Sequence, residues 1–224
     1  MSIIKNVSGS GADANSISDL VKNFLDGIGG DENGNSGVQR DGYRRIRWDN
    51  ENIPFKVPSD YFSASRGMVF SNNDGSNEFR VSNIDSDDRF DSINQEASKH
   101  FQTFSPKRLF APLGDNTVTF EFYLPGTDVP AVISAFGAVF VDVWLSNKTK
   151  MRFYDKFGNV IKEVAVEEYS SGLSFLGYNF GMPFIGKVEV VLGTSTLDNY
   201  VDQDDVVVLD DIYYSEPLKS DLFP

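Results

Sequence analysis

Two consecutive aspartates near the end of the chain are the residues whose setting most needs a chemical explanation. Asp210 and Asp211 lie within residues 204–214, an apolar stretch whose three consecutive valines favour a strand. The apolar residues run without alternation, which predicts a central strand covered on both faces. Because side chains alternate along a strand, we expect the two aspartates to point to opposite faces. A buried carboxylate needs a cation or several donors, so the alternatives are an arginine partner, the wet end of the strand, or a structural calcium ion.

A second group of oxygen-bearing side chains lies in a glycine-rich stretch earlier in the chain. Asp31, Asn33 and Asn35 occupy alternate positions, as the ligands of calcium loops do. The sixth position of this loop is Ser36 instead of glycine, however, and the twelfth is Gly42 instead of a bidentate glutamate. The stretch is therefore no EF-hand. A plain turn and a partial cation-binding loop both stay open.

Composition excludes several kinds of chemistry. The 224-residue chain has no cysteine and one histidine, which rules out disulfides, thiolate metal sites and a zinc site with several histidines from one chain. The formal net charge of -13 argues against a surface that neutralises nucleic-acid phosphates. No run reaches the roughly 18 apolar residues that a membrane helix needs, so we expect no membrane insertion.

No constellation of catalytic residues stands out. Ser174 lies in a sequence without the second glycine of a nucleophile elbow, and His100 is the single histidine that could activate it. A glycosidase needs two carboxylates at a suitable separation, but no spacing among the 33 acidic residues singles out a pair. A glycoside hydrolase or other hydrolase is the least favoured hypothesis, and we expect a protein without catalytic activity.

Aromatic side chains near the expected turns indicate a different kind of site. Tyr169, Tyr178 and Tyr200 lie in or near loops, where aromatic rings can form a platform for a sugar. Most of the 19 phenylalanines, in contrast, are expected to lie in the core. The tyrosines therefore predict a carbohydrate as ligand, such as an extracellular polysaccharide.

Hydrophobic periodicity predicts the elements that would position these residues. An amphipathic helix over residues 15–30, packed on a sheet, is predicted by one face of a 3.6-residue repeat, formed by Ile17, Leu20, Val21, Phe24, Leu25 and Ile28. Residues 1–14 are expected to be a flexible segment that contains a possible docking strand, and residues 218–224 a C-terminal tail. Residues 31–217 carry many strands separated by glycine, proline and asparagine turns. They predict a single all-β domain, an antiparallel jelly-roll-like β-sandwich.

Six stretches of the chain resemble motifs of a family of uncharacterised secreted bacterial proteins that are β-rich. The patterns are GRRxIxWDG, SPRGxxF, FSPxRLF, FGAVFxDV, GLSFLG and VVVMDDFxY, which resemble residues 42–49, 65–70, 104–110, 136–143, 172–177 and 206–213. The resemblance extends from about residue 17 to residue 217, although Asn50 stands where the first pattern has glycine. It implies a secreted β-rich protein.

More loosely, the chain is similar to extracellular jelly-roll modules that bind carbohydrate or mediate adhesion. In such modules a structural calcium ion often bridges an early strand and the last strand. This similarity implies a calcium ion held by Asp210 and Asp211, with Asp49 as a third ligand. It is a similarity of fold, which by itself assigns no function.

Two non-catalytic hypotheses follow. In the favoured one, the protein is an extracellular binding or adhesion module, braced by calcium and recognising a glycan. In the alternative, it assembles with copies of itself, and Ile3, Ile4 and Val7 add a strand to the open sheet edge of a neighbour. No secretory signal is visible at the start of the sequence, so an extracellular location implies that Met1 replaces a removed leader.

Overall fold

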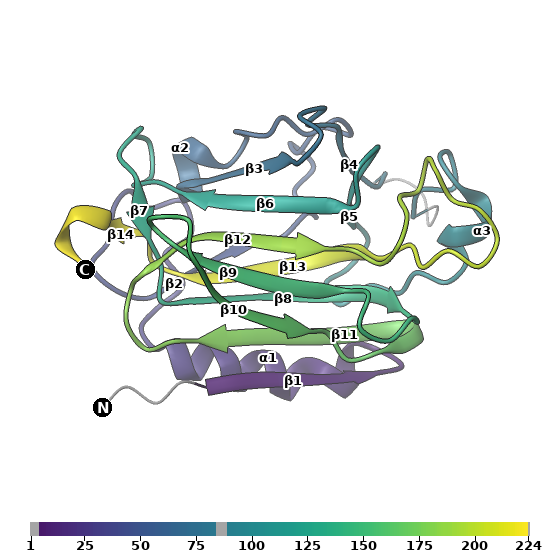
Figure 1. Ribbon diagram of the computed structural model, residues 1–224, viewed down its shortest axis with the longest axis horizontal. Coiled ribbons are helices and arrows are strands. Elements are labelled where there is room, and N and C mark those ends of the chain that lie inside the picture. The colour runs from purple at the N-terminus through teal and green to yellow at the C-terminus, as the bar shows by residue number, and fades with distance from the viewer. Residues whose placement is uncertain (1–4, 84–88, 224) are drawn as a thin grey trace.

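The chain folds into two antiparallel sheets packed against each other, shown in Figure 1 as a computed structural model that describes residues 5–83 and 89–223. The first sheet has the order β1 (Lys5–Gly11), β11 (Tyr169–Asn179), β8 (Ala135–Val143), β13 (Val208–Ser215), β5 (Phe110–Pro112) and β4 (Phe79–Val81), and β2 (Tyr43–Ile46) also pairs with β13. The second has the order β10 (Val160–Ala165), β9 (Lys150–Asp155), β12 (Ile185–Val191), β6 (Thr117–Phe122) and β3 (Met68–Asn72). The prediction of an all-β sandwich with antiparallel sheets is confirmed.

Short elements complete the fold. A two-stranded ribbon pairs β7 (Ala131–Val132) with β14 (Leu218–Lys219), and a 3₁₀ turn, η1 (Ser220–Leu222), follows it. The helices are α1 (Ala14–Ile28), α2 (Ser63–Arg66) and α3 (Gln95–Ser98). Within the part of the chain that is described, no helix has the length and apolar character needed to cross a membrane.

The chain runs through the sandwich as a set of nested strand pairs. The innermost pair is the hairpin β9–β10 in the second sheet, and the pair around it is β8–β11 in the first. Next comes β6–β12 in the second sheet, and the outermost pair is β5–β13 in the first. Successive pairs thus alternate between the two sheets, which brings the ends of distant segments together at each end of the sandwich.

Aromatic rings fill the space between the sheets. The ring of Trp48 stacks on Phe110 with centroids 4.5 Å apart, and Phe110 also stacks on Phe79. Phe70 and Phe120 join this cluster from β3 and β6 of the second sheet. All five side chains are at most 1% exposed, so this cluster ties the two sheets together.

Helix α1 covers the outer face of the first sheet, as its position beside β1 and β11 in Figure 1 shows. Asp13 caps the helix by accepting a 3.0 Å hydrogen bond from the backbone N–H of Ser16. Phe24 is buried over two glycines of neighbouring strands, Gly137 and Gly177. A Cβ atom at either glycine would lie within 2.8 Å of the Phe24 ring, so the close approach of helix and sheet requires glycine there.

The N-terminal segment belongs to the sheet of its own chain. Residues 5–11 form a strand, since β1 pairs along its whole length with Leu173–Asn179 of β11. Val7 is half-buried and packs with the cluster under α1. Ile3 and Ile4, the other two residues expected to mediate assembly, lie outside the described residues. The sequence indicated a possible docking strand up to Val7 and a flexible tether after it. The strand extends to Gly11 because pairing at a sheet edge uses backbone groups, which serine and glycine also supply.

Candidate functional site

The carboxylates of Asp210 and Asp211 meet at a single hydroxyl group. An oxygen of each lies 2.9 Å from Oγ of Ser105. The prediction that they point to opposite faces is therefore wrong. The pairing of β13 with β8 shifts register between Leu209 and Ile212, where β13 has one extra residue. Such a bulge interrupts the alternation of side chains, which explains why two adjacent residues reach the same atom.

Asp49 joins the same cluster, so the structure brings together the three carboxylates that sequence reasoning grouped. Its Oδ2 lies 2.8 Å from Oγ of Ser105, and its Oδ1 accepts a hydrogen bond from the backbone N–H of Arg108. Asp211 forms an ion pair with Arg45 at 2.5 Å and also accepts a hydrogen bond from the hydroxyl of Tyr213. We call Asp49, Ser105, Asp210 and Asp211 the aspartate cluster. It joins three stretches of the chain that are far apart in sequence.

The proton count at Ser105 is informative. Its hydroxyl carries one hydrogen, yet three carboxylate oxygens lie within hydrogen-bond distance of its oxygen. The other contacts need a proton on a carboxyl group or a cation. Burial, followed by the nearby charge of Asp211, raises the pKa of Asp210 well above its ordinary value. A neutral, protonated Asp210 can therefore donate to Ser105.

Two arginines balance the remaining charge of the aspartate cluster. Arg45 pairs with Asp211. Burial lowers the pKa of Arg108, and the nearby negative charge of Asp49 opposes this shift. Carboxylate and hydroxyl oxygens are also ligand types that calcium accepts. No group of three or more metal-ligating side chains with suitable geometry occurs in residues 5–83 and 89–223. With Asp210 protonated, the two arginines balance the charges of Asp49 and Asp211, and the protons of Ser105 and Asp210 account for two of the three contacts at the Ser105 hydroxyl oxygen.

The other expected calcium ligands lie in a loop that a buried ion pair holds. Glu216 pairs with Arg44 at 2.7 Å, and both side chains are at most 1% exposed. Glu216 also accepts hydrogen bonds from the Asn33 side-chain amide and from the Gln39 backbone N–H. Asn33 uses its amide nitrogen as a donor here. Asp31 accepts through its backbone carbonyl, and its side chain is exposed, as is that of Asn35.

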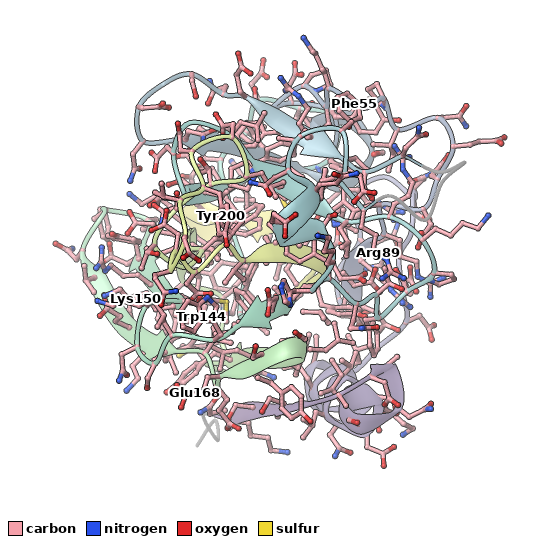
Figure 2. All side chains as sticks on the ribbon, turned by 90° about the vertical axis from the view of Figure 1, so that its right-hand side faces the viewer. Phe55, Arg89, Trp144, Lys150, Glu168 and Tyr200 are labelled. Atoms are coloured by element: carbon pink, nitrogen blue, oxygen red, sulfur yellow. The ribbon has the colours of Figure 1, made fainter. Side chains whose placement is uncertain are left out.

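A pocket at one end of the sandwich collects polar and aromatic side chains from several loops. It has a volume of about 190 Å³, and its lining includes His100, Asp142, Trp144, Tyr200, Asp202 and Asp204. Figure 2 views the molecule from this end and shows Tyr200 and Trp144 near the middle of the face. We call it the loop-end pocket. Its residues come from four separate parts of the chain, around residues 100, 143, 170 and 203.

Trp144 is both exposed and held in place. Its side chain is 37% exposed, while its indole Nε1–H donates a 3.3 Å hydrogen bond to the carbonyl of Asp204. The buried Asp205 side chain accepts hydrogen bonds from the backbone N–H groups of Trp144 and Leu145. Burial raises the pKa of Asp205 to about 6 against the opposing effect of these donors. The aromatic surface of the pocket is therefore fixed by hydrogen bonds before any ligand binds.

The backbone beside the loop-end pocket is unusual at two residues. Asp142 and Ser171 both have positive φ angles, 61° and 56°, at the point where the pairing of β8 and β11 shifts register. Asp142 accepts a 2.6 Å hydrogen bond from the Ser171 backbone N–H, and burial raises its pKa. Nδ1 of His100 lies 2.9 Å from the Ser171 hydroxyl. Residues other than glycine are strained in the left-handed backbone conformation, and such residues cluster at functional sites.

The three tyrosines expected to bind a ligand lie in different settings. Tyr200 lines the loop-end pocket. Tyr169 is 40% exposed and directly precedes Ser170 of the pocket lining, but it does not line the pocket itself. Tyr178 is half-buried and packs against Phe153 and Phe180, with ring centroids 5.6 and 4.6 Å away, so it belongs to the core. Sequence reasoning did not single out Trp144, although a tryptophan directly after β8 is a usable signal.

Comparisons with models of protein families, with curated proteins and with solved structures found no match for this chain.

Proposed function

We propose that this protein is a secreted, non-catalytic binding module that holds a neutral saccharide in the loop-end pocket. The observation that carries the proposal is Trp144, an exposed indole ring held in place beside hydrogen-bond acceptors. A pyranose has one face of C–H groups that packs on an aromatic ring, and an edge of hydroxyl groups that donates hydrogen bonds.

The polar lining of the pocket suits hydroxyl groups. Asp142, Asp202 and Asp204 supply carboxylate oxygens that accept hydrogen bonds, and Gln203 supplies an amide that both donates and accepts. The same carboxylates would repel an acidic sugar, and the net charge of -13 adds to that repulsion. A neutral sugar therefore fits this pocket better than a uronic acid or a sulfated sugar.

We also propose that the sandwich has a jelly-roll topology, which the path of the chain supports. A jelly roll is a double sheet of eight strands built from two Greek keys. The nested pairs β9–β10, β8–β11, β6–β12 and β5–β13, which alternate between the sheets, give such a path. In this arrangement loops gather at the ends of the sandwich, which is where the pocket lies.

Binding without catalysis is supported by the engagement of the pocket's acidic groups. Asp142 accepts a hydrogen bond from Ser171, and Asp204 accepts one from the backbone N–H of Val201. Ser174, the serine considered for a nucleophile, is completely buried in β11 and lies away from solvent. A binding role needs no activated nucleophile, and the fixed aromatic surface serves it directly.

Affinity electrophoresis tests this proposal. The protein is run in native gels that contain neutral polysaccharides, namely cellulose ethers, xylan, mannan, β-glucan or starch. We expect at least one polymer to retard the protein, and we expect Trp144→Ala to abolish the retardation. Mobility that is unchanged in every gel would contradict the proposal.

A further inference from the structure

A second cavity has the opposite electrostatic character. It has a volume of about 480 Å³ and lies beside β2 and α2, and its lining includes Arg45, Arg47, Arg66 and Tyr61. It shares no lining residue with the loop-end pocket. We call it the arginine cavity. Three arginines around one cavity are notable in a chain whose net charge is -13.

The three arginines reach the cavity from two elements. Arg45 lies in β2 and Arg47 directly after it, two residues apart, which is the spacing that puts side chains on the same face of a strand. Arg66 ends α2, and the left-handed Gly67 follows it. Gly67 has to be glycine, since a Cβ atom there would lie 2.1 Å from the carbonyl oxygen of Tyr123. This tight turn fixes where Arg66 enters the cavity wall.

Two nitrogen atoms of the Arg66 side chain lack hydrogen-bond partners. Its Nε and Nη1 atoms are buried and have no hydrogen-bond partner among the described residues. Burial lowers its pKa, Tyr214 and Glu32 oppose this shift, and the nearby Arg44 adds to it. A buried donor without an acceptor is costly, and more so when it carries a charge. Arg66 is therefore a cation whose hydrogen bonds are incomplete in the protein alone.

The other charges around the cavity leave a positive excess. Arg45 is paired with Asp211, and Asp49 is engaged by Ser105 and Arg108. The exposed Arg47 forms no hydrogen bond or ion pair within the described part of the chain. Glu32 is the remaining carboxylate in the cavity lining. Arg47 and Arg66 together thus outweigh Glu32.

We propose that the arginine cavity binds an oxyanion, a carboxylate or sulfate group, carried by a sugar. A guanidinium presents parallel N–H donors that match the oxygens of such a group. The cavity, with a volume of about 480 Å³, leaves room for a sugar ring beside Tyr61. This site consists of residues outside the loop-end pocket, so it does not depend on the proposed binding of a neutral saccharide.

Isothermal titration at low ionic strength tests the site with three probes: glucuronate, inorganic sulfate and uncharged glucose. We expect glucuronate to bind more tightly than sulfate and glucose not to bind here. Arg47→Gln and Arg66→Gln should each raise the Kd for glucuronate at least about tenfold. Arg152→Gln, which removes a paired arginine from β9, is the matched control and should leave the Kd unchanged.

A thermal melt separates a binding role of Arg66 from a structural one. Because its donors lack partners, we expect Arg66→Gln to melt no lower than the unsubstituted protein without ligand. Equal binding of sulfate and glucuronate would support the oxyanion site and assign it to the free ion. Failure of both anions to bind, or binding that survives both arginine substitutions, would overturn the proposal. Trp144→Ala should keep anion binding, so failure of the neutral-saccharide proposal is detected separately.

Discussion

Asp210 and Asp211 are adjacent in sequence, yet each places a carboxylate oxygen 2.9 Å from the hydroxyl oxygen of Ser105. The bulge in β13 creates this arrangement, and Asp49 completes it. The aspartate cluster connects the segment after β2, the segment before β5 and the central strand β13. It holds these three segments together. A test with calcium shows whether protons and arginines, or a metal ion, balance its charge.

Calcium should leave the melting temperature of chelator-treated protein unchanged. Arg45 and Arg108 balance two carboxylates, and a proton on Asp210 removes the third charge. If the cluster instead binds calcium, a concentration of 100 times the Kd would add about 2.7 kcal/mol to the free energy of unfolding. The melting temperature would then rise by roughly 5–10 °C. Melting curves with and without millimolar calcium distinguish the two cases, and magnesium is the control.

Glu216→Gln should destabilise the protein strongly. It leaves Arg44, a completely buried cation, without its charged partner and weakens the hold on the loop that contains Asn33. Breaking a buried ion pair in this way costs about 3–5 kcal/mol. Chemical denaturation measures the change.

Glu163→Gln is the matched control for that prediction. Glu163 pairs with Arg152 and Lys150 on the surface, where exposed ion pairs contribute less than about 1 kcal/mol. A similar loss of stability in the two variants would show that burial of the Arg44–Glu216 pair is not what makes it important.

Asp205→Asn should remove part of the pH dependence of stability. The pKa of Asp205 rises from about 3.9 in the unfolded chain to about 6 in the folded protein. The folded state therefore binds the proton more tightly, so this contribution to stability is complete below about pH 4 and is lost as the pH rises through about 6. The free energy of unfolding of the unsubstituted protein should fall more steeply over this range than that of Asp205→Asn. Parallel curves for the two proteins would contradict the assignment.

Deleting residues 1–11 should lower the melting temperature and promote aggregation. The deletion removes β1, leaves the edge of β11 without its partner and uncovers part of α1. The assembly hypothesis predicts instead that an oligomer is lost while the folded subunit keeps its stability. Light scattering and a thermal melt on the same samples separate these outcomes.

The sequence predicted the elements better than the sites. The 3.6-residue repeat around Phe24 and the apolar run before Asp210 each reflect burial within one segment, which periodicity reports directly. The bulge at Leu209 and the pairing of β1 depend on neighbouring strands, so no local pattern contains them.

The candidate sites show the same limit. Asp49 joined the aspartates through a resemblance of fold, while Ser105, which lies at the centre of the cluster, gave no signal of its own. Trp144 and Tyr200 are 56 positions apart in sequence and meet only because strand pairs nest and loops gather at one end. In the sequence Arg66 is an ordinary charged residue, because only the fold determines that two of its nitrogen atoms are buried without hydrogen-bond partners.

In the proposed function, Trp144 binds a neutral saccharide at the loop end. Isothermal titration with an oligosaccharide of the polymer that retards the protein measures it most directly. Three proteins are compared: the unsubstituted chain, Trp144→Ala, and Phe157→Ala, which removes an exposed aromatic side chain outside the loop-end pocket. We expect Trp144→Ala to raise the Kd at least about tenfold, the scale of a lost aromatic anchor, and Phe157→Ala to leave it unchanged. Equal affinities for all three proteins would contradict the account.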